Sequence, residues 1–151
     1  MNIAQTENIL FNPMFTSKLL LMALAGADSK RLKMELAYYI LPLIYNDTIK
    51  NKLVRSTTKS TFNTFLNSEV KVELIVVESL LVNYRKKSKE ALITLANIYN
   101  IDFSNYIILK EEQKITYSEE KNLILKEYYK AAFNLGAILS KEDYKKIFFN
   151  L

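Results

Sequence analysis

Residues 32–45, LKMELAYYILPLIY, form the stretch around which we expect the rest of the chain to fold. Its apolar residues recur at helical spacing and would share one face of a helix: Leu32, Leu36, Tyr39, Ile40 and Leu43. Further apolar residues make the second half apolar nearly all round, which predicts a core helix covered on several sides. Pro42 lacks a backbone donor and clashes with the preceding turn, so we expect a kink there or a helix end near Leu41.

The composition favours long helices. The chain has 151 residues, of which 50% are hydrophobic, and only two glycines and two prolines interrupt them. So few breakers favour helices over many short strands joined by tight turns. We therefore expect a mainly α, compact helical domain over residues 1–151 with one small β-hairpin. A division into a helical half, 9–67, and a winged-helix-like half, 69–151, stays open.

Histidine and cysteine are both absent, which removes the residues of most catalytic and metal sites. No His-based triad, His general base or usual zinc site can form without them. Glycine occurs only at positions 26 and 136, so a Gly-rich phosphate loop is excluded as well. We predict a protein that is not an enzyme and has no catalytic residue, cofactor, metal or small-molecule ligand.

The charge and the apolar runs bear on location. A formal net charge of +5 permits contact with nucleic acid or an acidic partner but demands neither. The N-terminus lacks the basic region and long apolar run of a secretion signal. The apolar run at residues 19–27 is about half of the ~20 residues that a membrane span needs. We expect a cytoplasmic protein without membrane contact.

Polar residues divide the first half into helices. Thr16 or Ser17 is expected to cap a helix that ends at Gly26, and Asp28 or Ser29 to cap the helix over 32–45. Two shorter helices are expected after it, over residues 48–55 and over residues 62–66.

In the second half the hydrophobic period changes twice. The pattern predicts helices over 69–84 and 88–99, a β-hairpin from 103–109 and 114–117, a helix over 118–139 capped by Ser118, and a short helix with Tyr144, Ile147 and Phe148 inward. The first of these helices carries an inward stripe of Val70, Leu74, Val77, Leu81 and Tyr84. Helix, helix, hairpin, helix is the order of a winged-helix layout.

A basic cluster, which we define as Arg85, Lys86, Lys87 and Lys89, lies between the two helices of that layout. It would stand at the entry to the helix that reads DNA in a winged helix, where its cations could neutralise phosphates. Charges at a helix junction are more often simply part of a solvated surface. The cluster keeps open the hypothesis of a small winged-helix DNA-binding transcriptional regulator.

Two short motifs in the first half point to a family. Residues 9–15, ILFNPMF, contain an N-P-x-F pattern made by Asn12, Pro13 and Phe15, and an apolar helix follows. Residues 40–44, ILPLI, contain an L-P-L element around Leu41 and Pro42. An alanine-leucine helix over 90–92 and a Leu-Gly pair at Leu135 and Gly136 come later.

In this order the motifs resemble the middle component of bacterial three-component ABC-ATPase systems, over most of the chain. The resemblance implies a non-enzymatic accessory subunit that bridges an SMC- or RecN-like ATPase and an effector, as in Lamassu-type anti-phage defence. Contact of the chain with DNA within the complex stays open. The chain departs from the family at Tyr45-Asn46, where a histidine or arginine is usual, and in lacking a Leu-Gly-containing tail before Leu151.

Overall fold

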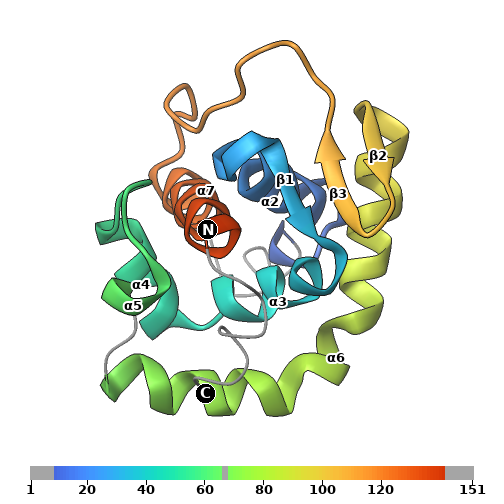
Figure 1. The fold of residues 1–151 in the computed structure, drawn as a ribbon. Helices are drawn as coiled ribbons and strands as arrows, with labels where there is room; N and C mark the ends of the chain where they lie inside the picture. The colour runs from blue at the N-terminus through green and yellow to red at the C-terminus, as the bar shows by residue number, and fades with distance from the viewer. Residues whose placement is uncertain (1–8, 66–67, 142–151) are drawn as a thin grey trace.

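The computed structural model describes residues 9–65 and 68–141 of the chain (Figure 1). Its elements in chain order are α2 (Pro13–Gly26), the 3-10 turn η1 (Asp28–Lys30), β1 (Arg31–Lys33), α3 (Met34–Ile44), α4 (Asp47–Arg55), α5 (Phe62–Phe65), α6 (Ser68–Ile98), β2 (Ile101–Phe103), β3 (Tyr106–Leu109) and α7 (Leu123–Lys141). Helices dominate and the sheet is small, so the prediction of a mainly α fold with a hairpin is confirmed. The short helix expected around Tyr144 lies outside the described residues.

The two glycines set the centre of the fold. Helix α2 is buried along most of its length and packs between α6 and α7. A Cβ atom added to Gly26 would lie 2.1 Å from the carbonyl oxygen of Phe133, and one added to Gly136 would lie 1.8 Å from that of Ala23. The backbones of α2 and α7 therefore touch at two places where only glycine leaves room. Helix α2 does end at Gly26 as predicted, although no glycine among the described residues has a positive φ.

Helix α2 begins earlier than predicted, because Asn12 caps it. The Asn12 side-chain oxygen accepts from the Met14 amide at 2.8 Å, and Pro13 occupies the first turn. The prediction of a cap at Thr16 or Ser17 is wrong. Their hydroxyls lie inside the helix and donate to the carbonyls of Pro13 and Met14 one turn earlier.

The stretch 32–45 divides between a strand and a helix. Ser29 and Lys30 have left-handed φ values of 58° and 52°, so the chain reverses there instead of capping a helix at Asp28 or Ser29. Leu32 belongs to β1, and α3 starts only at Met34. Because α3 continues through Pro42 to Ile44, an end near Leu41 is also wrong. The missing donor of a proline in the last turn removes only one helical hydrogen bond.

The sheet joins the two halves of the chain. Its antiparallel order is β1-β3-β2, with Leu32 opposite Ile107 and Phe103 opposite Ile107 on the other side. The predicted hairpin exists, but its strands are β2 and β3, and the prediction of a strand over 114–117 is wrong. Ile107 and Leu109 alternate toward the core, which holds β3 in place, whereas residues 110–122 form an irregular connection.

Helix α6 is continuous where two helices were predicted, so residues 85–87 stay helical. Figure 1 shows that it changes direction part-way, running along the lower edge and then up one side of the molecule. The predicted inward stripe is confirmed for Val70, Leu74 and Val77, which are all buried. The order helix, helix, hairpin, helix is not present from residue 68 onward, because one helix replaces the expected pair.

The last long helix begins at Leu123, so the prediction of a start at Ser118 is wrong. Asn122 caps it, since the Asn122 side-chain oxygen accepts from the amides of Ile124 and Leu125 at 3.0 and 3.1 Å. Buried Asn134, on the same helix, donates to the carbonyls of Leu53 and Ser56 at 2.9 and 3.0 Å. These two bonds satisfy backbone carbonyls at the C-terminal end of α4 and join that end to α7.

Candidate interaction surfaces

The N-P-x-F residues assemble the start of α2 and its contact with α7. Asn12 and Pro13 are exposed and begin the helix, while Phe15 is buried. The Phe15 ring lies 5.8 Å from that of Tyr128 and 5.7 Å from that of Tyr129, centroid to centroid. Edge-on and tilted aromatic contacts of this length stabilise the packing of two elements. These motif residues thus fix where α2 begins and how α2 packs against α7.

The later motif residues are buried as well. Leu41 and Pro42 lie on α3 and Leu135 lies on α7, all within the core. Gly136 provides the close approach to α2 described above. Of the predicted family-motif residues, those of α3 and α7 offer no accessible surface to a partner.

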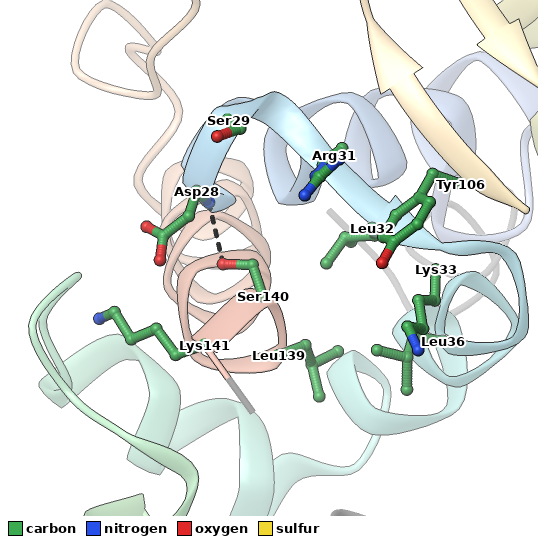
Figure 2. A pocket seen from close by; sticks show the side chains of 10 residues that line it. All are labelled: Asp28, Ser29, Arg31, Leu32, Lys33, Leu36, Tyr106, Leu139, Ser140 and Lys141. Carbon is green, nitrogen blue, oxygen red and sulfur yellow. Dashed lines mark hydrogen bonds between the residues drawn. The ribbon is translucent and has the colours of Figure 1, made fainter. Parts of the chain in front are cut away.

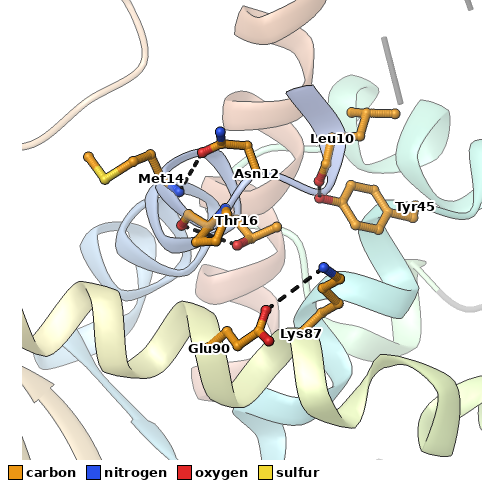
Figure 3. A network of polar contacts seen from close by, with 8 residues as sticks. Leu10, Asn12, Met14, Thr16, Tyr45, Lys87 and Glu90 are labelled. Atoms are coloured by element: carbon orange, nitrogen blue, oxygen red, sulfur yellow. Dashed lines mark hydrogen bonds and ion pairs between the residues drawn. The ribbon is translucent and has the colours of Figure 1, made fainter. Parts of the chain in front are cut away.

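Tyr45, which follows the L-P-L element, is the centre of an aromatic cluster. Its ring lies 5.6 Å from Phe11, 5.9 Å from Tyr84 and 6.2 Å from Tyr128. Its hydroxyl donates to the carbonyl of Leu10 (Figure 3). Burial, together with the nearby tyrosines, raises the pKa of Tyr45. The cluster joins the chain before α2 to α6 and α7.

Two lysines lie over tyrosine rings of α7, one of which belongs to this aromatic cluster. Lys50 lies 4.3 Å from the centre of the Tyr128 ring, and Lys18 lies 4.7 Å from that of Tyr129. Such cation–π contacts stabilise the cation over the ring face. Burial, and then the charge of Glu120, raises the pKa of Tyr129 to about 12. The faces and edges of these tyrosine rings are thus largely in contact with other side chains of the same chain.

A hollow of about 370 Å³ lies between β1 and the end of α7 (Figure 2). Cations surround it, but they are engaged within the chain. Arg31 stacks on Tyr106 at 4.6 Å from the ring centre, and Lys141 donates to the carbonyls of Thr58 and Ser60. The Asp28 amide donates to the Ser140 hydroxyl at 2.9 Å and holds the two walls together. The hollow therefore lacks the free converging donors that an anion site requires.

The basic cluster lies on α6. Arg85, Lys86 and Lys89 are exposed, whereas Lys87 forms a 3.8 Å ion pair with Glu90 (Figure 3). Ser88 between them is fully buried, and its hydroxyl has no hydrogen-bond partner among the described residues. The structure thus brings three of the four predicted phosphate-contact cations to the surface, without a separate reading helix behind them.

Sequence reasoning missed the most exposed apolar surface. Over its first turns α6 is apolar on its solvent side too, along residues that we call the outer stripe: Val72, Ile75, Val76, Ser79 and Val82. Val82 is 80% exposed, Val72 61% and Ile75 59%. Apolar side chains gathered in this way mark interaction sites. The signal was present in the sequence, because residues 70–82 are apolar on opposite sides of one helix.

A second exposed apolar group lies where α2 and α7 begin. Met14 is 60% exposed and lines a groove of about 500 Å³ together with Ile9, Phe15 and Leu125. Leu123, two residues before Leu125, is 76% exposed, and we call these two exposed residues the Met14–Leu123 group. It shares no residue with the outer stripe. One small chain thus offers apolar surface on two different groups of helices.

Neither a metal-binding cluster nor a membrane-spanning helix occurs among the described residues. No group of three or more acidic side chains there is arranged to hold a metal ion. None of the helices in residues 9–65 and 68–141 combines the length and the apolar character that crossing a bilayer requires.

Comparison with known proteins decides the family. The family model of ABC-three component (ABC-3C) system Middle Component 3, abbreviated MC3, matches residues 1–151. The chain belongs to the MC3 family. The same comparisons found no similar curated protein and no similar solved structure. The resemblance drawn from the N-P-x-F and L-P-L motifs is confirmed at the level of an ABC-3C middle component.

Proposed function

We propose that this MC3 chain is a non-catalytic accessory subunit of a cytoplasmic anti-phage defence complex. In this proposal it bridges an SMC- or RecN-like ABC ATPase and an effector, as in Lamassu-type systems. The observation that carries the proposal is the match of the whole chain to a middle component of a three-component system. The complete absence of histidine and cysteine from the sequence agrees with a subunit that performs no chemistry itself.

The distribution of exposed apolar side chains supports a bridging role. A subunit between two partners needs two separate surfaces, and the outer stripe and the Met14–Leu123 group are separate. Both are apolar and lie on well-packed helices, so neither must reorganise greatly on binding. The subunit would hold the effector inactive until the ATPase responds to foreign DNA.

Co-purification tests the proposal. The tagged chain is expressed together with the ATPase and effector components encoded beside it, and the eluate is analysed by mass and composition. We expect a stable complex that contains both components. Recovery of the tagged chain alone, when both other components are present and folded, contradicts the bridging role.

The exposed cations of the basic cluster support one rival, a small DNA-binding regulator. That function predicts that the purified chain alone shifts duplex DNA, and that the shift falls steeply with salt. It also predicts loss of the shift in Arg85→Glu/Lys86→Glu. A shift with these properties, together with no complex in the co-purification, would replace the accessory-subunit proposal.

A further inference from the structure

The two sides of α6 differ in what covers them. Val70, Leu74 and Val77 pack into the core, and the outer stripe on the opposite side is covered by nothing among the described residues. Helix formation alone does not require apolar residues on a solvated side, where polar residues are the rule. An uncovered stripe on a helix that already has a buried face indicates a partner.

The spacing of the stripe identifies the shape of that partner. Val72, Ile75, Ser79 and Val82 follow one another at alternating intervals of three and four residues. This is the a/d spacing by which one helix packs lengthwise against another. The stripe spans about 15 Å of helix at ~1.5 Å per residue. The small Ser79 in its middle allows a close approach.

The charges around the stripe identify the chemistry of that partner. The three–four spacing continues from Val82 to Lys86 and Lys89, and Arg85 adjoins them. All three cations are exposed and form no ion pair among the described residues. Lys71, Glu78 and Arg85 follow one another at intervals of seven residues along one side of the stripe. Positive charge therefore collects at the C-terminal end of the stripe, where Lys86 and Lys89 join Arg85. A complementary helix would therefore carry apolar residues first and aspartate or glutamate after them.

A groove beside the stripe offers a place for a larger side chain. It has a volume of about 350 Å³ and lies between α3 and α6, with Met34 and Tyr38 on one wall and Leu81, Val82 and Arg85 on the other. Val82 belongs to both the groove and the outer stripe. An apolar side chain at the edge of a docked helix can enter the groove while the seam follows the stripe.

We infer that the outer stripe and the basic cluster together bind one amphipathic helix of another component of the complex, whose apolar a/d seam runs into acidic residues. The inference rests on the proposed function and adds to it the chemistry of one partner segment. It also gives the basic cluster a role without DNA, because Lys86 and Lys89 would face carboxylates.

Substitution in the outer stripe tests the inference in the three-component complex. Ile75→Glu/Val82→Glu places two charges in the apolar seam, and binding of one component should weaken at least about tenfold. Ile98→Glu, at a residue that is 47% exposed at the end of the same helix and belongs to neither apolar surface, is the control and should leave that component bound. All these positions are exposed, so circular dichroism and thermal unfolding should show an unchanged fold.

Charge reversal tests the second half of the inference. Lys86→Glu/Lys89→Glu should weaken the binding of the same component and make that binding less sensitive to salt. The control Lys121→Glu lies on the connection before α7 and should change neither. A photoreactive residue at position 75 should then cross-link to a partner peptide whose sequence is amphipathic and acidic at one end.

The outcomes separate the two proposals. If the wild-type chain forms the complex and the stripe variants form it equally well, this inference is wrong and the bridging function stands. A cross-link to a second copy of this chain, to its own residues 142–151 or to DNA also overturns the inference. If the wild-type chain forms no complex at all, the proposed function fails and the inference fails with it.

Discussion

The replacement of Gly136 by alanine is the sharpest test of how α2 and α7 pack. In a solvated helix this change stabilises the helical state by about 1 kcal/mol, because glycine is a poor helix former. Here the new Cβ would lie 1.8 Å from the backbone oxygen of Ala23 and 2.5 Å from its carbonyl carbon. Neither atom belongs to a flexible side chain, so the two helices must separate.

The contact distance sets the size of the effect. To bring the Cβ to 3.0 Å, below which such contacts are essentially not found, the backbones must move apart by 3.0 − 1.8 = 1.2 Å. A gap of ~1 Å already removes up to about half of the dispersion energy of the atoms facing it. Overpacking that forces side chains and backbone to shift costs about 1–3 kcal/mol. After the gain of about 1 kcal/mol in helix propensity is subtracted, we expect a net loss of up to about 2 kcal/mol.

Urea unfolding followed by circular dichroism measures this loss. Gly136→Ala should lower the midpoint while leaving the slope m unchanged. Gly26→Ala, whose Cβ would meet the Phe133 oxygen at 2.1 Å, should behave alike, and the double variant should lose less than the sum. Exposed Asn97→Ala on α6 is the control for propensity alone and should be slightly stabilising. A midpoint for Gly136→Ala equal to or above that of the wild type would refute the close packing.

Three further outcomes follow from buried polar groups. Ser88→Ala removes a buried hydroxyl without a partner and should raise the free energy of unfolding by about 1 kcal/mol in urea titrations, so a destabilised variant would reveal a hidden bond. Asn134→Asp keeps the side-chain shape but turns a carboxylate toward the carbonyls of Leu53 and Ser56. Thermal unfolding should show a loss of stability larger than the ~1–3 kcal/mol expected for Asn134→Ala. Equal losses of stability in the two variants would contradict the donor role of Asn134. Burial raises the pKa of Tyr129 to about 12, so as pH rises the unfolded chain releases this phenolic proton before the folded chain does. The free energy of unfolding should be unaffected below pH 10, fall as pH rises toward 12, and fall less in Tyr129→Phe. An identical pH profile of stability for that variant would exclude the linkage.

The helical character of the chain and the inward stripe of α6 could be predicted from the sequence because they depend on local period and composition. Leu74 and Val77 are buried where the 3.6-residue period places them. The helix starts were harder. Several polar residues near each helix start can act as the cap. In the structure Asn12 and Asn122 cap the helices in place of Ser17 and Ser118, because the packing of neighbouring helices decides where each helix begins.

The sheet and the continuity of α6 could not be predicted from local sequence. Strand β1 has three residues and is stable only because β3, more than seventy residues later, pairs with it. No glycine or proline interrupts residues 68–98, and the charges at 85–87 do not end a helix by themselves. Burial of family-motif residues such as Leu135 also follows from tertiary packing, which the short motifs indicate only through their resemblance.

The position of α7 in the chain has a consequence for synthesis. This helix is the last described element to leave the ribosome, yet it covers the apolar helix α2, which leaves among the first. A chain that stops before residue 123 therefore lacks the contacts of Phe15 with Tyr128 and Tyr129 and that of Ala23 with Gly136, and cannot complete its core. Such a product is a substrate for proteases and chaperones before it is a competitor for assembly. Packing of α2 into the core thus depends on a helix that is synthesised much later in the chain.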